Sequence, residues 1–96
     1  MHNSNGVYEL RYNGNGLCDL YVSGQATVQG ANLTTQLINI DSAYNPISIP
    51  KARVGNTSAF KQIAYVSSGG FYIYNTENVG SITIQFSETY AVQKFN

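Results

Sequence analysis

The sequence has little charge, one cysteine, one histidine and no tryptophan. Only 10% of its 96 residues are charged, whereas an ordinary globular domain carries roughly 25%. Five Lys and Arg balance five Asp and Glu, so the chain lacks the basic excess that supplies most of the affinity for nucleic acids. We therefore expect no nucleic-acid partner.

Long apolar runs are absent too. No stretch approaches the roughly 20 apolar residues of a membrane span, and no basic leader precedes an apolar stretch. We expect neither a transmembrane helix nor a signal peptide, and no membrane partner. The lone Cys18 excludes an intrachain disulfide, the usual zinc spacings are missing, and no cofactor is implied. A single domain of this size is marginally stable, and self-association is the remaining means of stabilising it.

Uncharged polar residues take the place of the missing charges. Asn, Ser, Thr and Gln make up 33 of the 96 residues, and eight tyrosines add further hydroxyls. Val, Ile, Thr, Tyr and Phe cluster in short runs separated by Gly, Asn and Ser, which predicts an all-β fold of short strands. We expect a polar leader at residues 1–6 and one domain at 7–96. The expected strands lie near 7–12, 17–23, 26–30, 33–40, 47–54, 59–67, 70–75, 79–86 and 87–93.

One segment, residues 58–70, has an alternative reading, because Phe60, Ile63 and Ala64 are also spaced as on a helix. We favour a strand. Elsewhere the alternation is clear: Ile82, Ile84 and Phe86 should point inward. Phe71 and Ile73 should also face the core, so Tyr72 and Tyr74 point away from it. Those two tyrosines could serve a subunit interface, a ligand surface or plain cross-strand packing.

The first two strands form a hairpin whose register can be inferred, because facing residues in an antiparallel pair lie on the same side of the sheet. One register keeps the apolar residues on one face, and it implies a five-residue connection or a glycine bulge at 13–17. Shifting it by one residue would mix charge into the core. The favoured register pairs Tyr8 with Val22, Leu10 with Leu20, Tyr12 with Cys18 and, on the other face, Arg11 with Asp19.

A series of short phrases runs from about residue 7 to residue 93: YELRY at 8–12, LYVSG at 20–24, IDSAYNP at 40–46, GGFYIY at 69–74 and a closing segment at 80–90. In order and spacing they resemble the C-terminal head domain of receptor-binding proteins from tailed bacteriophages that infect Gram-positive bacteria, the lactococcal type in particular. Asp41 and Asn45 stand where that family more often has proline and arginine.

The resemblance implies a small antiparallel β-sandwich, a jelly roll of the tumour-necrosis-factor type, assembled as a homotrimer. It further implies a head at the tail tip or baseplate of a virion that recognises host cell-wall saccharides. The implied partners are host cell-wall polysaccharide, further copies of the chain and other baseplate proteins. A structural trimerisation or baseplate-linking module is the alternative function.

The sequence shows no evident set of catalytic residues. A glycosidase needs two carboxylates at a fixed separation, and the five acids here are scattered. His2, the only imidazole, lies in the expected leader, and Cys18 falls on the inward face of its strand, where a thiol is inert. We expect no enzymatic activity.

Saccharide sites combine aromatic faces with planar polar groups, and this composition is rich in both. Structural roles are the alternative for each candidate: Tyr72 and Tyr74 could pack between subunits, Asn75 could hold a turn, and Arg11 with Asp19 could be a surface ion pair. Tyr72 and Tyr74 exposed beside Asn75 would favour the receptor role. The candidate binding residues are Asp19, Tyr44, Asn45, Arg53, Tyr72, Tyr74, Asn75 and Glu77.

Overall fold

A computed structural model describes residues 4–55, 62–77 and 80–92 of the chain. The described residues confirm the expected all-β fold, and none of them belongs to a helix long and apolar enough to cross a membrane. In chain order, the elements are β1 (Ser4–Tyr12), β2 (Leu17–Thr27), β3 (Leu33–Asn39), the 3-10 turn η1 (Ser42–Tyr44), β4 (Lys51–Val54), β5 (Gln62–Ser67), β6 (Gly70–Asn75) and β7 (Ser81–Ala91).

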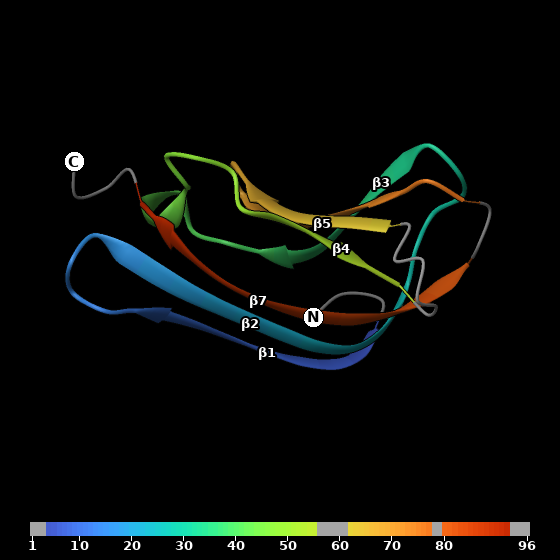
Figure 1. Ribbon diagram of the computed structural model, residues 1–96, viewed down its shortest axis with the longest axis horizontal. Helices are drawn as coiled ribbons and strands as arrows, with labels where there is room; N and C mark the ends of the chain where they lie inside the picture. Colours follow the sequence, from blue (N-terminus) through green and yellow to red (C-terminus); the bar gives the residue numbers. More distant parts are fainter. Residues whose placement is uncertain (1–3, 56–61, 78–79, 93–96) are drawn as a thin grey trace.

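The strands form two antiparallel sheets that face each other as a β-sandwich (Figure 1). One sheet has the order β1-β2-β7 and is the lower layer in Figure 1, with β1 along its outer margin. The other has the order β3-β6-β5-β4, a Greek-key arrangement. The pairings of β2 with β7 and of β3 with β6 are nested, as in a jelly roll, whereas β4 and β5 stay in the sheet of β3 and β6.

The predicted register of the first hairpin is confirmed. Tyr12 lies opposite Cys18, and Leu10 lies opposite Leu20. The connection at residues 13–16 is closed by a hydrogen bond from the Asn13 N–H to the Leu17 carbonyl, 3.1 Å long. β1 begins at Ser4, so residues 4–6, expected in a polar leader, belong to the sheet.

In two places the structure has one long strand where two short strands were expected. β2 replaces the strands at 17–23 and 26–30, and β7 replaces those at 79–86 and 87–93. The cause is their mutual pairing, which runs without interruption from Leu17 opposite Ala91 to Thr27 opposite Ser81. A strand paired along its whole length continues through local turn signals, because each residue gains ladder hydrogen bonds.

The expected strand at 47–54 is shorter. β4 begins only at Lys51, after Pro50, which has no N–H to give to a ladder. η1 was not expected; the Asp41 carboxylate accepts a hydrogen bond from the Ala43 N–H at 2.9 Å and begins this turn. Residues 62–67 form a strand, as favoured over a helix. The parts of the expected leader, strands and domain that fall at 1–3, 59–61, 79 and 93–96 lie outside the described residues.

The core lies between the two sheets and is built by strand alternation. Ile82, Ile84 and Phe86 of β7 point inward as predicted, and so do Phe71 and Ile73 of β6. The rings of Phe71 and Phe86 meet edge to face at 5.0 Å and connect the two layers. With the inner faces filled in this way, the outer faces and the open edges of the sheets are the surfaces available for partners.

Candidate functional site

Three tyrosines and an isoleucine lie together on the outer surface of the four-stranded sheet. Tyr72 and Tyr74 alternate with the buried Phe71 and Ile73 of β6, so they point away from the core. On the neighbouring strand β5, Tyr65 lies opposite Tyr72, and Ile63 lies opposite Tyr74. All four side chains are half-buried. We call the patch formed by Ile63, Tyr65, Tyr72 and Tyr74 the tyrosine face.

The rings of the tyrosine face are held in place by contacts within the chain. Tyr65 and Tyr72 stack with ring centroids 5.5 Å apart and planes 22° apart. The Tyr72 hydroxyl donates to the Ser68 carbonyl at 2.9 Å, and the Tyr74 hydroxyl donates to the Asn32 Oδ1 at 3.3 Å. Because these hydroxyls are anchored, the rings are ordered before a ligand arrives, which lowers the entropic cost of binding.

Polar side chains border the tyrosine face on both sides. On β3, Gln36 lies opposite Tyr72 and Thr34 lies opposite Tyr74. On β4, Lys51 lies opposite Tyr65 and Arg53 lies opposite Ile63. All four bordering side chains are exposed, so the face has amide and hydroxyl groups along one margin and two cations along the other. A shallow hollow of about 270 Å³ on the cationic side is lined by Ile49, Lys51, Ile63, Tyr65 and Tyr74.

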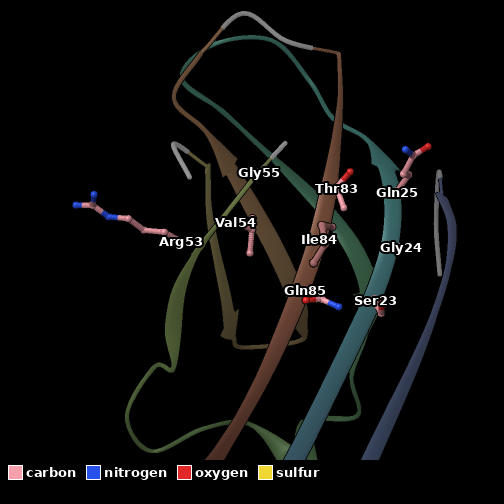
Figure 2. A pocket seen from close by; sticks show the side chains of 9 residues that line it. All are labelled: Ser23, Gly24, Gln25, Arg53, Val54, Gly55, Thr83, Ile84 and Gln85. Atoms are coloured by element: carbon pink, nitrogen blue, oxygen red, sulfur yellow. The ribbon is translucent and has the colours of Figure 1, made fainter. Parts of the chain in front are cut away.

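Arg53, a predicted site residue, thus belongs to the same surface as Tyr72 and Tyr74. A second hollow, of about 340 Å³, lies where β4 approaches β2 and β7. Figure 2 shows the guanidinium of Arg53 pointing away from this hollow. The hollow is lined by Ser23, Gly24, Gln25, Arg53, Val54, Gly55, Thr83, Ile84 and Gln85. With Arg53 directed outward, none of the described residues that line the hollow brings a charge into it.

Asn75 is separated from the predicted cluster. Its side chain is fully buried and lies on the core side of β6, opposite to Tyr72 and Tyr74. Its Oδ1 accepts from the Gln62 Nε2 and the Glu77 N–H, each at 3.1 Å, and its Nδ2 donates to the Gln29 carbonyl at 2.7 Å. The expectation of Asn75 as a surface ligand group is therefore corrected: its carboxamide holds three segments together. Glu77, half-buried in the following loop, is held by that contact.

Tyr44 is the last residue of η1, and Asn45 follows it. Tyr44 is half-buried against the core, with its ring 6.1 Å from that of Tyr12. The Asn45 Oδ1 accepts from the Gly69 N–H at 3.0 Å, and its Nδ2 donates to the Ser68 Oγ at 3.3 Å. Asn45 thus fastens the β5–β6 turn, the same turn whose Ser68 carbonyl anchors Tyr72.

Asp19 lies on the outer face of the three-stranded sheet, whereas the tyrosine face belongs to the four-stranded sheet. Its carboxylate accepts a hydrogen bond from the Thr89 hydroxyl. Arg11 lies opposite Asp19 in the register but forms its ion pair with Glu9, at 2.6 Å. The expected surface pair of Arg11 and Asp19 is therefore replaced by a pair within β1.

The sequence-based prediction missed four residues of this surface: Tyr65, Ile63, Lys51 and Gln36. The signal for Tyr65 was present, because the alternation of β5 places it on the same side as Ile63 and opposite to the buried Ala64 and Val66. A register argument across the tight turn at residues 68–69 would have brought Tyr65 beside Tyr72. The contributions of β3 and β4 depend on pairings between more distant segments, which no local pattern reveals.

Cys18 and Tyr90 are cross-strand partners on the inner side of the three-stranded sheet. Burial raises the pKa of the Cys18 thiol, with a smaller contribution from the Asp19 carboxylate. Burial raises the pKa of Tyr90 well above its ordinary range, and the nearby Cys18 adds to this effect. A buried thiol with a raised pKa stays protonated, as expected for an inert core cysteine.

Within residues 4–55, 62–77 and 80–92, no cluster of three or more His, Cys, Asp or Glu side chains could hold a metal ion. No family model, curated protein or solved structure matches the chain. Its function is therefore best argued from the tyrosine face and from the sequence phrases described above.

Proposed function

We propose that the protein is the receptor-binding head of a phage tail and that it binds host cell-wall saccharide on the tyrosine face. The observation that carries this proposal is the stacked pair of Tyr65 and Tyr72, continued by Tyr74 and Ile63 and bordered by polar groups on two strands. The resemblance to phage head domains supports the phage and cell-wall parts of the proposal.

The face suits a sugar chemically. The C–H side of a pyranose ring packs on an aromatic ring, and its hydroxyls require donors and acceptors around the rim of the ring. Tyr65, Tyr72 and Tyr74 supply the ring surface. Gln36 offers its side-chain oxygen as an acceptor on one side, and its Nε2 already donates within the chain. Lys51 and Arg53 offer donors on the other side. The open, shallow shape fits a repeating polymer that lies across the strands.

Adhesion in this proposal depends on the number of copies. A shallow site with a few hydrogen bonds binds a sugar weakly, but linked copies on one virion convert weak binding into firm attachment. The proposed activity is therefore binding without hydrolysis. Incubation of the purified protein with wall polysaccharide should release no reducing ends.

The direct test is binding of the purified protein to purified host-wall polysaccharide, measured by calorimetry for the wild type and for Tyr65→Ala and Tyr72→Ala. Loss of a stacking surface worth about 1 kcal/mol should weaken binding roughly fivefold in each variant. Tyr21→Ala is the matched control, because Tyr21 is 46% exposed on the outer face of the other sheet. Equal affinities for all four proteins would remove the tyrosine face from the proposal.

The alternative, a structural module of the virion, is favoured by a separate observation: β1 is a long edge strand with the exposed apolar residues Val7 and Tyr8. Competition distinguishes the two functions. The receptor head should block phage adsorption to host cells at concentrations that saturate the wall polysaccharide. A folded protein that neither blocks adsorption nor binds polysaccharide would instead be assigned to the structural role.

A further inference from the structure

β1 is an open edge of the three-stranded sheet. It pairs with β2 on one side, and no other described strand pairs with it. All nine of its residues are exposed or half-buried, including Tyr8 at 46% and Val7 at 66%. Such a long edge exposes unpaired backbone groups that can pair with another chain, and proline, a bulge, charged side chains or a covering segment are the usual protection against this. β1 contains no proline.

The hydrogen-bond alternation shows which backbone groups point to that edge. Asn13 donates to the Leu17 carbonyl, so the odd-numbered residues of β1 direct their N–H and C=O groups to β2. The backbone groups of Gly6, Tyr8 and Leu10 therefore point away from β2. An additional strand must bond to these even-numbered residues, which restricts the possible registers.

The side chains of β1 complement a second, antiparallel copy of β1. If Leu10 of one copy lies opposite Leu10 of the other, Glu9 lies opposite Arg11 of the second copy, and Arg11 lies opposite Glu9. This register also satisfies the even-numbered backbone groups. The nearest permitted registers place Glu9 opposite Glu9 or Arg11 opposite Arg11, and like charges directly opposite each other are destabilising. Charge thus selects one register.

The same register completes the apolar inner side. A two-fold axis perpendicular to the sheet keeps the inner faces of both copies on one side, so Tyr8 of one copy faces Tyr12 of the other. The exposed Tyr8 and the half-buried Leu10 would then lie in a continuous strip between the two sandwiches. The ion pair that Glu9 and Arg11 now form within one strand, with 62% and 70% of their side chains exposed, would be exchanged for two pairs between copies.

We propose that two copies of the chain associate through β1, antiparallel and centred on Leu10, to make one continuous six-stranded sheet. The contact lies on the sheet opposite to the tyrosine face and leaves that face open on both copies. It does not depend on saccharide binding. A head built in this way presents its binding faces in pairs, and a three-fold assembly of the kind implied by the resemblance would become a dimer of trimers.

The test is the mass in solution, measured by light scattering for the wild type, Glu9→Arg, Arg11→Glu and the exchange variant Glu9→Arg/Arg11→Glu. Each single variant places like charges opposite each other twice, so its mass should be half that of the wild type. The exchange variant restores both ion pairs and should recover the wild-type mass. Arg53→Glu, with the same charge change as Arg11→Glu but on β4, should leave the mass unchanged. Circular dichroism verifies that every variant is folded.

Hydrogen exchange provides a second, site-specific readout. The amides of Tyr8 and Leu10 should be protected in the wild type and exchange at least tenfold faster in Glu9→Arg, whereas those of Glu9 and Arg11, bonded to β2, should be protected in both. The proposal is overturned by a monomeric wild type, by single variants that keep the wild-type mass, or by an exchange variant that stays at half mass. A trimer that is indifferent to these substitutions would equally contradict it.

Discussion

Asn75 connects segments that are distant in the sequence through one buried carboxamide. It contacts Gln62 at the start of β5, the Gln29 carbonyl in the loop before β3, and the N–H of Glu77. A buried polar group of this kind is stable only when all its hydrogen bonds are made. Its role is therefore to hold the end of the sheet that carries the tyrosine face.

Replacement of Asn75 by Ala should lower the free energy of unfolding by about 2–4 kcal/mol, because it leaves the buried Gln62 amide without its acceptor. Urea unfolding followed by circular dichroism measures the change. Asn15→Ala, in the exposed turn between β1 and β2, is the control and should change stability by less than about 0.5 kcal/mol. Similar values for both variants would contradict the structural role of Asn75.

Cys18 and Tyr90 make stability sensitive to alkaline pH. Both groups are neutral when protonated, and burial raises the pKa of each in the folded state. Above the ordinary values of 9.0 for the thiol and 10.0 for the phenol, the unfolded chain loses protons that the folded chain retains. The free energy of unfolding should therefore be unaffected by these groups below about pH 8 and should fall as the pH rises toward 11.

Tyr90→Phe tests this linkage, because the Tyr90 hydroxyl is buried with no hydrogen-bond partner among the described residues. Removal of an unsatisfied buried hydroxyl should leave stability at pH 7 unchanged or raise it by up to about 1 kcal/mol. The alkaline decline should become shallower than in the wild type. Urea titrations at several pH values measure both effects, and an unchanged alkaline slope would show that Tyr90 does not contribute to it.

At the scale of the elements, β1 and β2 approach each other closely where Gly24 lies opposite Gly6. Gly24 has a φ of 140°, and a Cβ added there would lie 2.3 Å from the Cα of Gly6. The neighbouring atom is backbone and cannot rotate away. The long paired strand β2 therefore continues past residue 24 only because that residue has no side chain.

Gly24→Ala should consequently destabilise the protein by about 3 kcal/mol or more, through both backbone strain and a backbone clash. Gly14→Ala separates the two contributions: Gly14 also has a positive φ, 86°, but an added Cβ would have no atom within 4 Å. This control should cost only about 1 kcal/mol. Thermal unfolding of both variants supplies the comparison, and equal costs would exclude the clash as the cause.

At the scale of the whole molecule, zero net charge and an uncharged polar surface suit a partner rich in hydroxyls. The two cations beside the tyrosine face act in the proposal as hydrogen-bond donors to the sugar. Contacts of this kind depend little on screening by salt, in contrast to the binding of a polyanion.

We therefore expect the affinity for wall polysaccharide to change less than about threefold between low and moderate ionic strength. Calorimetry at two salt concentrations measures this, with Lys51→Ala as a comparison. The affinity that Lys51→Ala loses relative to the wild type should be the same at both salt concentrations. A steep loss of wild-type binding with salt, abolished by Lys51→Ala, would show that the ligand is recognised through its charge.

The sequence predicted local features of the fold correctly. Alternation placed Phe71 and Ile73 inside and Tyr72 and Tyr74 outside. The requirement that apolar residues face each other across the hairpin identified the register of β1 and β2. Of the predicted site residues, Tyr72, Tyr74 and Arg53 share one surface. Asn75 was misplaced because its neighbours in the sequence resemble a surface loop, whereas its hydrogen-bond partners come from β5 and from residue 29.

The sequence by itself determined the class of the fold, the inward side of each well-patterned strand and the polar, uncharged character of the surface. These depend on residue type and on a period of two, which are local properties. The tertiary structure decided the continuity of β2 and β7, the meeting of Tyr65 with Tyr72 and the burial of Asn75. Each of these depends on which distant segments lie side by side, and that choice is made by the packing of the two sheets against a common core.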